Sequence, residues 1–169
     1  MEPPTDPAVR LTAFGNQLIQ VHLWLREQLE VLRDELESAP EGGRQRDLSL
    51  HCLAFCAAVS RHHGGEDAVA FPDLAERSPE LRPVLEELGR DHRLVAEVLR
   101  RLEELLGGGL DPERARDART ELDSLAALLE THFTYEERRL ARALNSLRRP
   151  HWEASPPGFL LTSPAQIPR

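Results

Sequence analysis

The sequence lacks the features that mark secreted and membrane-embedded proteins. It contains only two cysteines in 169 residues, Cys52 and Cys56. They lie four residues apart on one apolar helix face, where a disulfide would strain the helix, so we expect two buried thiols that pack in the core. There is no apolar run of about eighteen residues, which argues against a transmembrane helix. The N-terminus has neither the basic nor the apolar part of a signal peptide, and we therefore expect a cytoplasmic location.

Positive charge and aromatic side chains are also scarce. Lys and Arg number 21 against 29 Asp and Glu, the net charge is -8, and aromatic residues make up 5% of the chain. A surface rich in carboxylates repels phosphate, so neither nucleic acid nor a membrane is expected as a partner. The abundant residues are instead Leu, Ala, Glu and Arg, which favour helices. The length suits one domain with a substantial core, and we predict an all-α protein.

Four amphipathic segments predict four long helices. Their apolar residues recur at alternating spacings of three and four, as in helices that pack in a bundle. The helices are expected from about Ala8 to Ser38, from about Arg44 to Pro72, from about Pro79 to Leu106, and from Pro112 to Leu147. Because the connections are short, an antiparallel up-down-up-down four-helix bundle is the predicted fold.

The predicted bundle domain covers residues 8–147. Residues 1–7 are rich in proline and are expected to form a flexible N-terminus. Residues 148–169 contain five prolines and cannot continue the last helix, so they are expected to form a C-terminal tail. The tail also carries apolar side chains, which leaves open whether it docks on the bundle: Trp152, Phe159, Leu160 and Leu161.

One histidine interrupts the apolar stripe of each expected helix. A single histidine in such a stripe is usually a hydrogen-bonded core residue, whereas one on each of four helices indicates a shared site. These histidines are His22, His62, His92 and His132. Gly64 and Gly65 lie inside the second helix and destabilise it by roughly 1 kcal/mol each relative to alanine. This cost indicates crowding, or a needed gap, beside His62.

Two of the four histidines are followed by glutamate at helical spacing. His62 and Glu66 share one helix face, and so do His132 and Glu136, because residues four apart point the same way. In both segments a second acid follows at the next position and a leucine lies twelve residues after the histidine. This common register selects His62, and not the adjacent His63, as the partner of Glu66.

The antiparallel arrangement predicts that these six side chains converge in the core. At a rise of about 1.5 Å per residue, they lie roughly 8–23 Å from the same pole of the bundle. Two unpaired carboxylates in a core would cost several kcal/mol each unless a cation or hydrogen-bond donors compensate them. A metal centre supplies that compensation, while a purely structural polar core stays open as the alternative.

Other polar residues lie either near the expected ligands or at ordinary flanking and surface positions. Four are candidates for a layer around the ligands: His63, Asp67, Tyr135 and Glu137. We favour flanking positions for His63, which is rotated about 100° off the stripe, and for Tyr135. The two acids are expected either to point outward or to lie beside the ligands. His51 lies roughly 16 Å from His62 along the helix, and His151 lies in the tail, so neither is expected to bind a metal.

Together, His22, His62-x-x-x-Glu66, His92 and His132-x-x-x-Glu136 resemble the hemerythrin-like (HHE cation-binding) family. The resemblance covers about residues 8–147, and the surrounding residues are similar to actinobacterial members. It implies a non-haem di-iron centre inside a four-helix bundle. The four histidines would be terminal ligands, and the two glutamates would bridge two iron ions that also share an oxo or hydroxo group.

The sequence departs from the oxygen carriers of this family, which use two histidines one turn apart on the third helix. Here the residues one turn either side of His92 are Leu88 and Ala96. Each iron would then have five ligands and one open position, which suits redox chemistry on a small ligand. We therefore expect a di-iron oxidoreductase that reacts with O2, H2O2 or NO and takes electrons from an unknown donor. The alternative is iron or oxygen sensing, storage or carriage without turnover, and the ligand types leave Zn and Mn open.

Overall fold

The computed structural model describes residues 13–38, 43–148, 152, 157, 159 and 160. Its long helices are α2 (Phe14–Glu37), α3 (Gly43–Gly65), α5 (Arg82–Gly107) and α6 (Pro112–Asn145). α3 continues through a π-helical turn, η1 (Glu66–Ala70), into α4 (Phe71–Arg77). A short 3-10 turn, η2 (Pro79–Leu81), then leads into α5.

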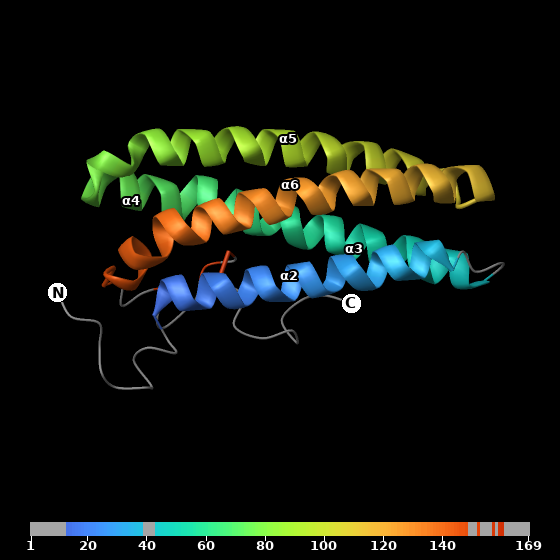
Figure 1. Cartoon of the computed structure of the whole chain (residues 1–169), viewed down its shortest axis with the longest axis horizontal. Coiled ribbons are helices and arrows are strands. Elements are labelled where there is room, and N and C mark those ends of the chain that lie inside the picture. Colours follow the sequence, from blue (N-terminus) through green and yellow to red (C-terminus); the bar gives the residue numbers. More distant parts are fainter. Residues whose placement is uncertain (1–12, 39–42, 149–151, 153–156, 158, 161–169) are drawn as a thin grey trace.

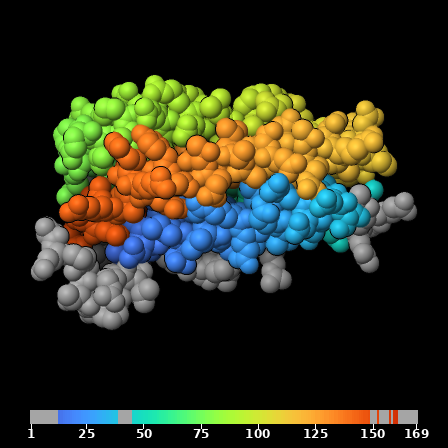
Figure 2. Space-filling view, viewed as in Figure 1, coloured from blue at the N-terminus to red at the C-terminus, as the bar shows by residue number. Residues whose placement is uncertain are grey.

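The four long helices form an antiparallel bundle, which confirms the predicted all-α fold. They run alternately in opposite directions, and α2 packs against α3 and α6, as does α5 (Figure 1). Each helix therefore lies beside its neighbours in the sequence, and α6 closes the bundle against α2. These two helices lie side by side across one face of the molecule (Figure 2). Among the described helices, none has the length and apolar character needed to cross a bilayer.

The helix starts agree with the prediction at α6 and differ at α2. At α6 the side chain of Asp111 accepts a hydrogen bond from the main-chain N–H of Arg114 (2.9 Å), so Asp111 caps the helix as its position before Pro112 predicted. α2 begins at Phe14 and so starts later than the predicted Ala8. The expected lead-in, residues 1–7, lies outside the described residues, and the domain limits remain a prediction.

The second helix also differs from the prediction, because it continues past Pro72. The N–H of Phe71 donates to the carbonyl of Glu66, five residues earlier, which is the spacing of a π-helix. Proline has no N–H and crowds the carbonyl four residues before it, and a wider turn relieves this crowding. The extra residue shifts the register by one. Ala70 is therefore buried, whereas Val69, which a regular α-helix would place on the same face as Glu66, is exposed.

A polar layer divides the core into two apolar clusters. Along α5, Leu88 belongs to the smaller cluster and Val95 to the larger one, and the buried His92 lies between them. α6 shows the same order in reverse, with Leu129 in the larger cluster and Leu140 in the smaller. Apolar residues therefore pack on both sides of the layer that contains the four stripe histidines.

Cys52 and Cys56 pack as the sequence predicted. Both thiols are fully buried in the larger cluster and neither forms a disulfide. Burial raises the pKa of each thiol to about 12, because the thiolate would lose its hydration in the core. They are therefore unreactive packing residues.

Gly15 allows α2 and α6 to approach closely. A Cβ at this position would lie 2.2 Å from the carbonyl oxygen of Ala141 and 2.6 Å from the side-chain oxygen of Asn145. The same oxygen of Asn145 accepts a hydrogen bond from the main-chain N–H of Asn16 (3.2 Å). An added methyl group would thus push apart two helices that carry residues of the polar layer.

We expect Gly15→Ala to lower the free energy of unfolding by roughly 1–3 kcal/mol, the range for added volume at a packed contact. Urea denaturation measures this change. Gly89→Ala in α5 is the matched control, since its Cβ would meet no atom within 4 Å. It should raise the free energy of unfolding by up to about 1 kcal/mol through helix propensity. A Gly15→Ala protein as stable as the control would contradict the close approach.

Candidate metal centre

The six side chains selected from the sequence meet in the polar layer. Each comes from a core position on the buried stripe of its helix, and each is almost completely buried. They are His22 on α2, His62 on α3, Glu66 at the start of η1, His92 on α5, and His132 and Glu136 on α6. The layer therefore receives side chains from all four sides of the bundle.

One group of possible metal-ligand atoms lies between α2, α3 and α6. The Nε2 atoms of His22 and His62 are 3.0 Å apart, and Nε2 of His62 lies 3.1 Å from Oε1 of Glu66. Oε2 of Glu136 lies 3.3 Å from Nε2 of His22. Two ligand atoms that are each ~2.1 Å from one ion, at a right angle, are ~3.0 Å apart. This group therefore has the spacing of ligands around a single cation.

A second group lies on the α5 side. The Nε2 atoms of His92 and His132 are 3.2 Å apart, and Oε2 of Glu66 lies 3.3 Å from Nε2 of His92. Oε2 of Glu136 lies 3.6 Å from Nε2 of His132. The two oxygens of Glu66 thus face different histidine pairs, and the arrangement offers two cation positions that share this carboxylate.

His63 belongs to the second group, so the flanking position favoured from the sequence is wrong. Its side chain is 5% exposed, and its ring stacks on His92 with centroids 4.0 Å apart. Donor atoms of His63, Glu66, His92 and His132 all lie within 4.8 Å of one another, and the buried Nε2 of His63 has no hydrogen-bond partner. Because α3 packs against both α2 and α5, a residue just off its stripe still faces the core.

Each of the four stripe histidines has an acceptor for its Nδ1 proton. With that proton on Nδ1, the Nε2 atom presents a lone pair to the centre, which is the usual state of a metal-binding histidine. The pairs are His22 with Glu137 (2.8 Å), His62 with the carbonyl of Phe159 (2.8 Å), His92 with Asp67 (2.8 Å) and His132 with Asp91 (3.1 Å). The sequence selected Asp67 and Glu137 for positions near the ligands, whereas it missed Asp91 and Phe159.

This orientation leaves the centre with acceptors only. Four Nε2 lone pairs face it, together with both carboxylates, and none of the four oxygens of Glu66 and Glu136 accepts a hydrogen bond. Imidazole nitrogens lie near these oxygens, but in directions that do not make hydrogen bonds. Buried acceptors that face one another are unfavourable unless protons or cations lie between them.

The pKa shifts of the metal-free centre reflect the same need for positive charge. Burial lowers the pKa of His22, but the nearby carboxylates of Glu136 and Glu137 outweigh burial and raise it to about 9. Burial and the charge of His22 lower the pKa of His62 to about 3. The other pair repeats this contrast, because carboxylates outweigh burial and raise the pKa of His92 to about 9, while burial lowers that of His132. Without a cation, one histidine of each pair would therefore be protonated, His22 in the first pair and His92 in the second.

The two carboxylates of the centre shift in opposite directions. Burial raises the pKa of Glu66, and the nearby charge of Glu136 adds to this effect. Burial also opposes ionisation of Glu136, but the attraction of the neighbouring imidazoles, that of His22 above all, outweighs it and lowers the pKa of Glu136. In the metal-free protein a proton on Glu66 thus relieves the repulsion between two buried carboxylates, and a bound cation would take over that role.

A family model described as the hemerythrin HHE cation binding domain matches residues 15–144. The chain belongs to the hemerythrin HHE family. A search of curated proteins and a search of solved structures returned no match. The matched range contains all six stripe residues as well as His63. Membership implies that the domain binds a metal cation, and the buried acceptors without donors fit that conclusion.

His51 and Tyr135 of this hemerythrin HHE domain lie outside the cluster. His51 is 35% exposed and interacts with Gln28 and Glu35 (both 3.3 Å). The hydroxyl of Tyr135 donates to Glu87 (2.5 Å), a flanking position as favoured from the sequence. His151 lies outside the described residues.

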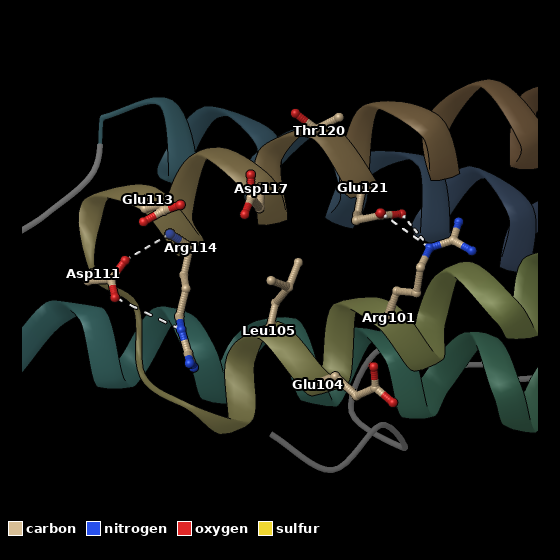
Figure 3. Close-up of a pocket in the computed structure, with 9 residues that line it drawn as sticks. All are labelled: Arg101, Glu104, Leu105, Asp111, Glu113, Arg114, Asp117, Thr120 and Glu121. Carbon is tan, nitrogen blue, oxygen red and sulfur yellow. Dashed lines mark hydrogen bonds and ion pairs between the residues drawn. The ribbon is translucent and has the colours of Figure 1, made fainter.

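A surface pocket of about 700 Å³ lies elsewhere in the domain, between α5 and α6 near their connection (Figure 3). Five carboxylates and no histidine line it. Arg101 pairs with Glu121 (3.2 Å), and Asp111 is already engaged as the cap of α6. Glu121 and Asp111 in the pocket thus have hydrogen-bonding partners, whereas the carboxylate oxygens of the buried cluster accept no hydrogen bond.

Proposed function

We propose that this domain holds two iron ions and reacts with a small ligand, O2, H2O2 or NO. One observation carries the proposal: buried Nε2 atoms face each other in two pairs, at 3.0 and 3.2 Å, around carboxylates that accept no hydrogen bond. Two cations would satisfy all of these acceptors, and two separate pairs call for two positions. Iron bound there supplies a change of oxidation state and a coordination position for the ligand.

The chain's own residues have distinct tasks in this proposal. One ion would be held by His22, His62, Glu66 and Glu136, and the other by His92 and His132 with the same two glutamates. The carboxylates opposite the Nδ1 atoms keep the protons of three rings away from the metal positions. The apolar clusters on either side exclude water, which strengthens the electrostatic attraction between carboxylate and cation.

His63 changes the ligand count deduced from the sequence. Its position in the second group supports three imidazoles on one ion and two on the other. Leu88, fully buried in the smaller cluster, and Ala96, which is exposed, provide no further ligand on α5. An Ala96→His side chain would face solvent. With this ligand set, an open position for a small ligand would belong to the ion held between His22 and His62.

We expect His63→Phe to lower the iron content from about two ions per chain toward one. Phenylalanine keeps a flat ring against His92 but removes the nitrogen donor, and loss of even an indirect partner of a metal ligand weakens binding about 10–100-fold. Metal analysis after gel filtration measures the content. His51→Phe is the matched control and should retain both ions. Full iron content in His63→Phe would reduce His63 to a packing residue.

A second candidate function is oxygen carriage or sensing without turnover. The position of His63 favours it, because three imidazoles on one iron is the number found in the oxygen carriers of the family. The two functions predict different behaviour of the iron-loaded protein. We expect consumption of peroxide or NO, followed with electrodes, and no long-lived reversible binding of O2. Reversible O2 binding without consumption of peroxide or NO would select carriage or sensing.

The identity of the metal has its own test. Imidazole and carboxylate ligands also suit zinc and manganese. Elemental analysis of the isolated protein, combined with an absorption spectrum, separates these metals, because coupled ferric ions absorb in the near ultraviolet and Zn²⁺ does not. A protein that retains only zinc would remove redox chemistry from the proposal and leave a cation-binding domain.

A further inference from the structure

His62 differs from the other three stripe histidines in the source of its Nδ1 acceptor. The acceptors of His22, His92 and His132 are carboxylates on the helices of the bundle. His62 donates instead to a main-chain carbonyl, that of Phe159, at 2.8 Å and 97 residues further along the chain. Phe159 therefore takes part in the layer, although it lies outside the four long helices.

Packing in the smaller cluster fixes the position of Phe159. Its side chain is fully buried, and its ring contacts that of Trp152, with centroids 5.5 Å apart. Trp152 is itself 3% exposed and packs edge-on against Phe14 of α2, at 5.1 Å. The N–H of Leu160, also buried, donates to the carbonyl of Pro157 in a turn (2.9 Å). These contacts hold the carbonyl of Phe159 against the helix that carries His62.

Gly65 provides the space in which Phe159 lies. A Cβ on Gly65 would be 3.0 Å from Cβ of Phe159 and 3.1 Å from its nitrogen, whereas a Cβ on Gly64 would meet nothing within 4 Å. The gap that the two glycines indicated in the sequence is therefore needed at Gly65. A side chain at Gly65 would press on Phe159 and force it to shift relative to His62.

We propose that Phe159 is a positioning residue of the metal centre. Its carbonyl holds the proton of His62 on Nδ1, so that the Nε2 lone pair faces His22 and Glu66. In the other tautomer, a proton on Nε2 would occupy the space between these groups and oppose a cation. The role toward a cation rests on the proposed function, whereas the tautomer is a property of the protein alone.

Gly65→Ala tests this role, and Gly64→Ala is its matched control. Both add one methyl group to the same helix, but only the first meets Phe159. In the metal-free protein, ¹⁵N–¹H NMR of the imidazoles reports the tautomer of His62. In the iron-loaded protein, transfer of iron to a chelator reports retention. We expect Gly65→Ala to lose the single Nδ1–H tautomer and to release iron about 10–100-fold faster. Gly64→Ala and Phe159→Leu, which keeps an apolar anchor and the carbonyl, should match the wild type.

Other results would overturn the proposal. One is a Gly65→Ala protein with the wild-type tautomer and release rate, and another is an equal effect of the two alanine substitutions. If the wild type binds no iron, the proposed function fails, but loss of the tautomer in metal-free Gly65→Ala still supports the positioning role. Should a melting curve show that Gly65→Ala does not fold, Phe159→Ala takes its place with the same expected result, because it removes the anchoring ring without crowding the helix.

Discussion

Replacing His62 or Glu136 by alanine should remove most of the bound iron. Nε2 of His62 lies at the centre of the first group, 3.0 Å from Nε2 of His22 and 3.1 Å from Glu66. Glu136 touches both groups, at 3.3 Å from His22 and 3.6 Å from His132, and it supplies negative charge to a buried site. Its loss would leave cations facing mainly neutral imidazoles. We expect the content to fall from about two irons per chain to well below one, because ligands act together in one buried site.

The controls for this experiment are the two histidines that the sequence excluded from the site. His51→Ala should keep its iron, since this residue is partly exposed and interacts with Gln28 and Glu35. We expect the same of His151→Ala in the C-terminal tail. Normal iron content after His62→Ala would mean that the helical register was misread. The pair of His63 with Asp67 would then become the one to replace, although Asp67 is already engaged by His92.

Sequence periodicity was sufficient to predict the bundle and the convergence of six side chains. A helix in a four-helix bundle repeats its core contacts every three or four residues, so one polar residue among aliphatic ones identifies a level in the core. The comparison of four such levels needs only the helix rise and the antiparallel order. His22 and His92 lie in one layer for this reason, although 70 positions separate them in the chain.

The features that the sequence did not reveal depend on contacts between elements. His63 was assigned a flanking position because a narrow stripe treats α3 as facing one neighbour, while it packs against both α2 and α5. Ala70 replaces Val69 in the core because a π turn adds a residue at Glu66, and such turns have no clear sequence signal. Asp91 binds His132 and not its own neighbour in the chain, which only the packing of α5 against α6 determines.

The acceptors around the layer differ between the two histidine pairs. Glu137 accepts from His22 and from Arg26 (2.8 and 2.9 Å), and these bonds outweigh burial and lower its pKa, so it stays charged. His62, on the same side, donates to a neutral carbonyl. A carboxylate makes an imidazole a stronger ligand than a carbonyl does. The ion between His22 and His62 would therefore be held less tightly than its neighbour.

Removing the metal should make the protein much less stable. A cation that binds the folded chain only, at a free concentration of a thousand times its Kd, adds about 4 kcal/mol to the free energy of unfolding. For a protein of this size, 1 kcal/mol corresponds to roughly 2–4 °C, so chelation should lower the melting temperature by about 8–16 °C. Circular dichroism of the iron-loaded and the chelated protein measures the difference.

A second variant separates this effect from other actions of the chelator. In His62→Ala the metal is already lost, so its melting temperature should change little on chelation. The wild-type shift depends on the acceptors that face one another in the layer, since without cations they need protons, as the raised pKa values of His22 and His92 indicate. Equal melting temperatures with and without metal would mean that protons alone satisfy the layer. The four histidines would then be structural residues of a polar core, as the alternative drawn from the sequence holds.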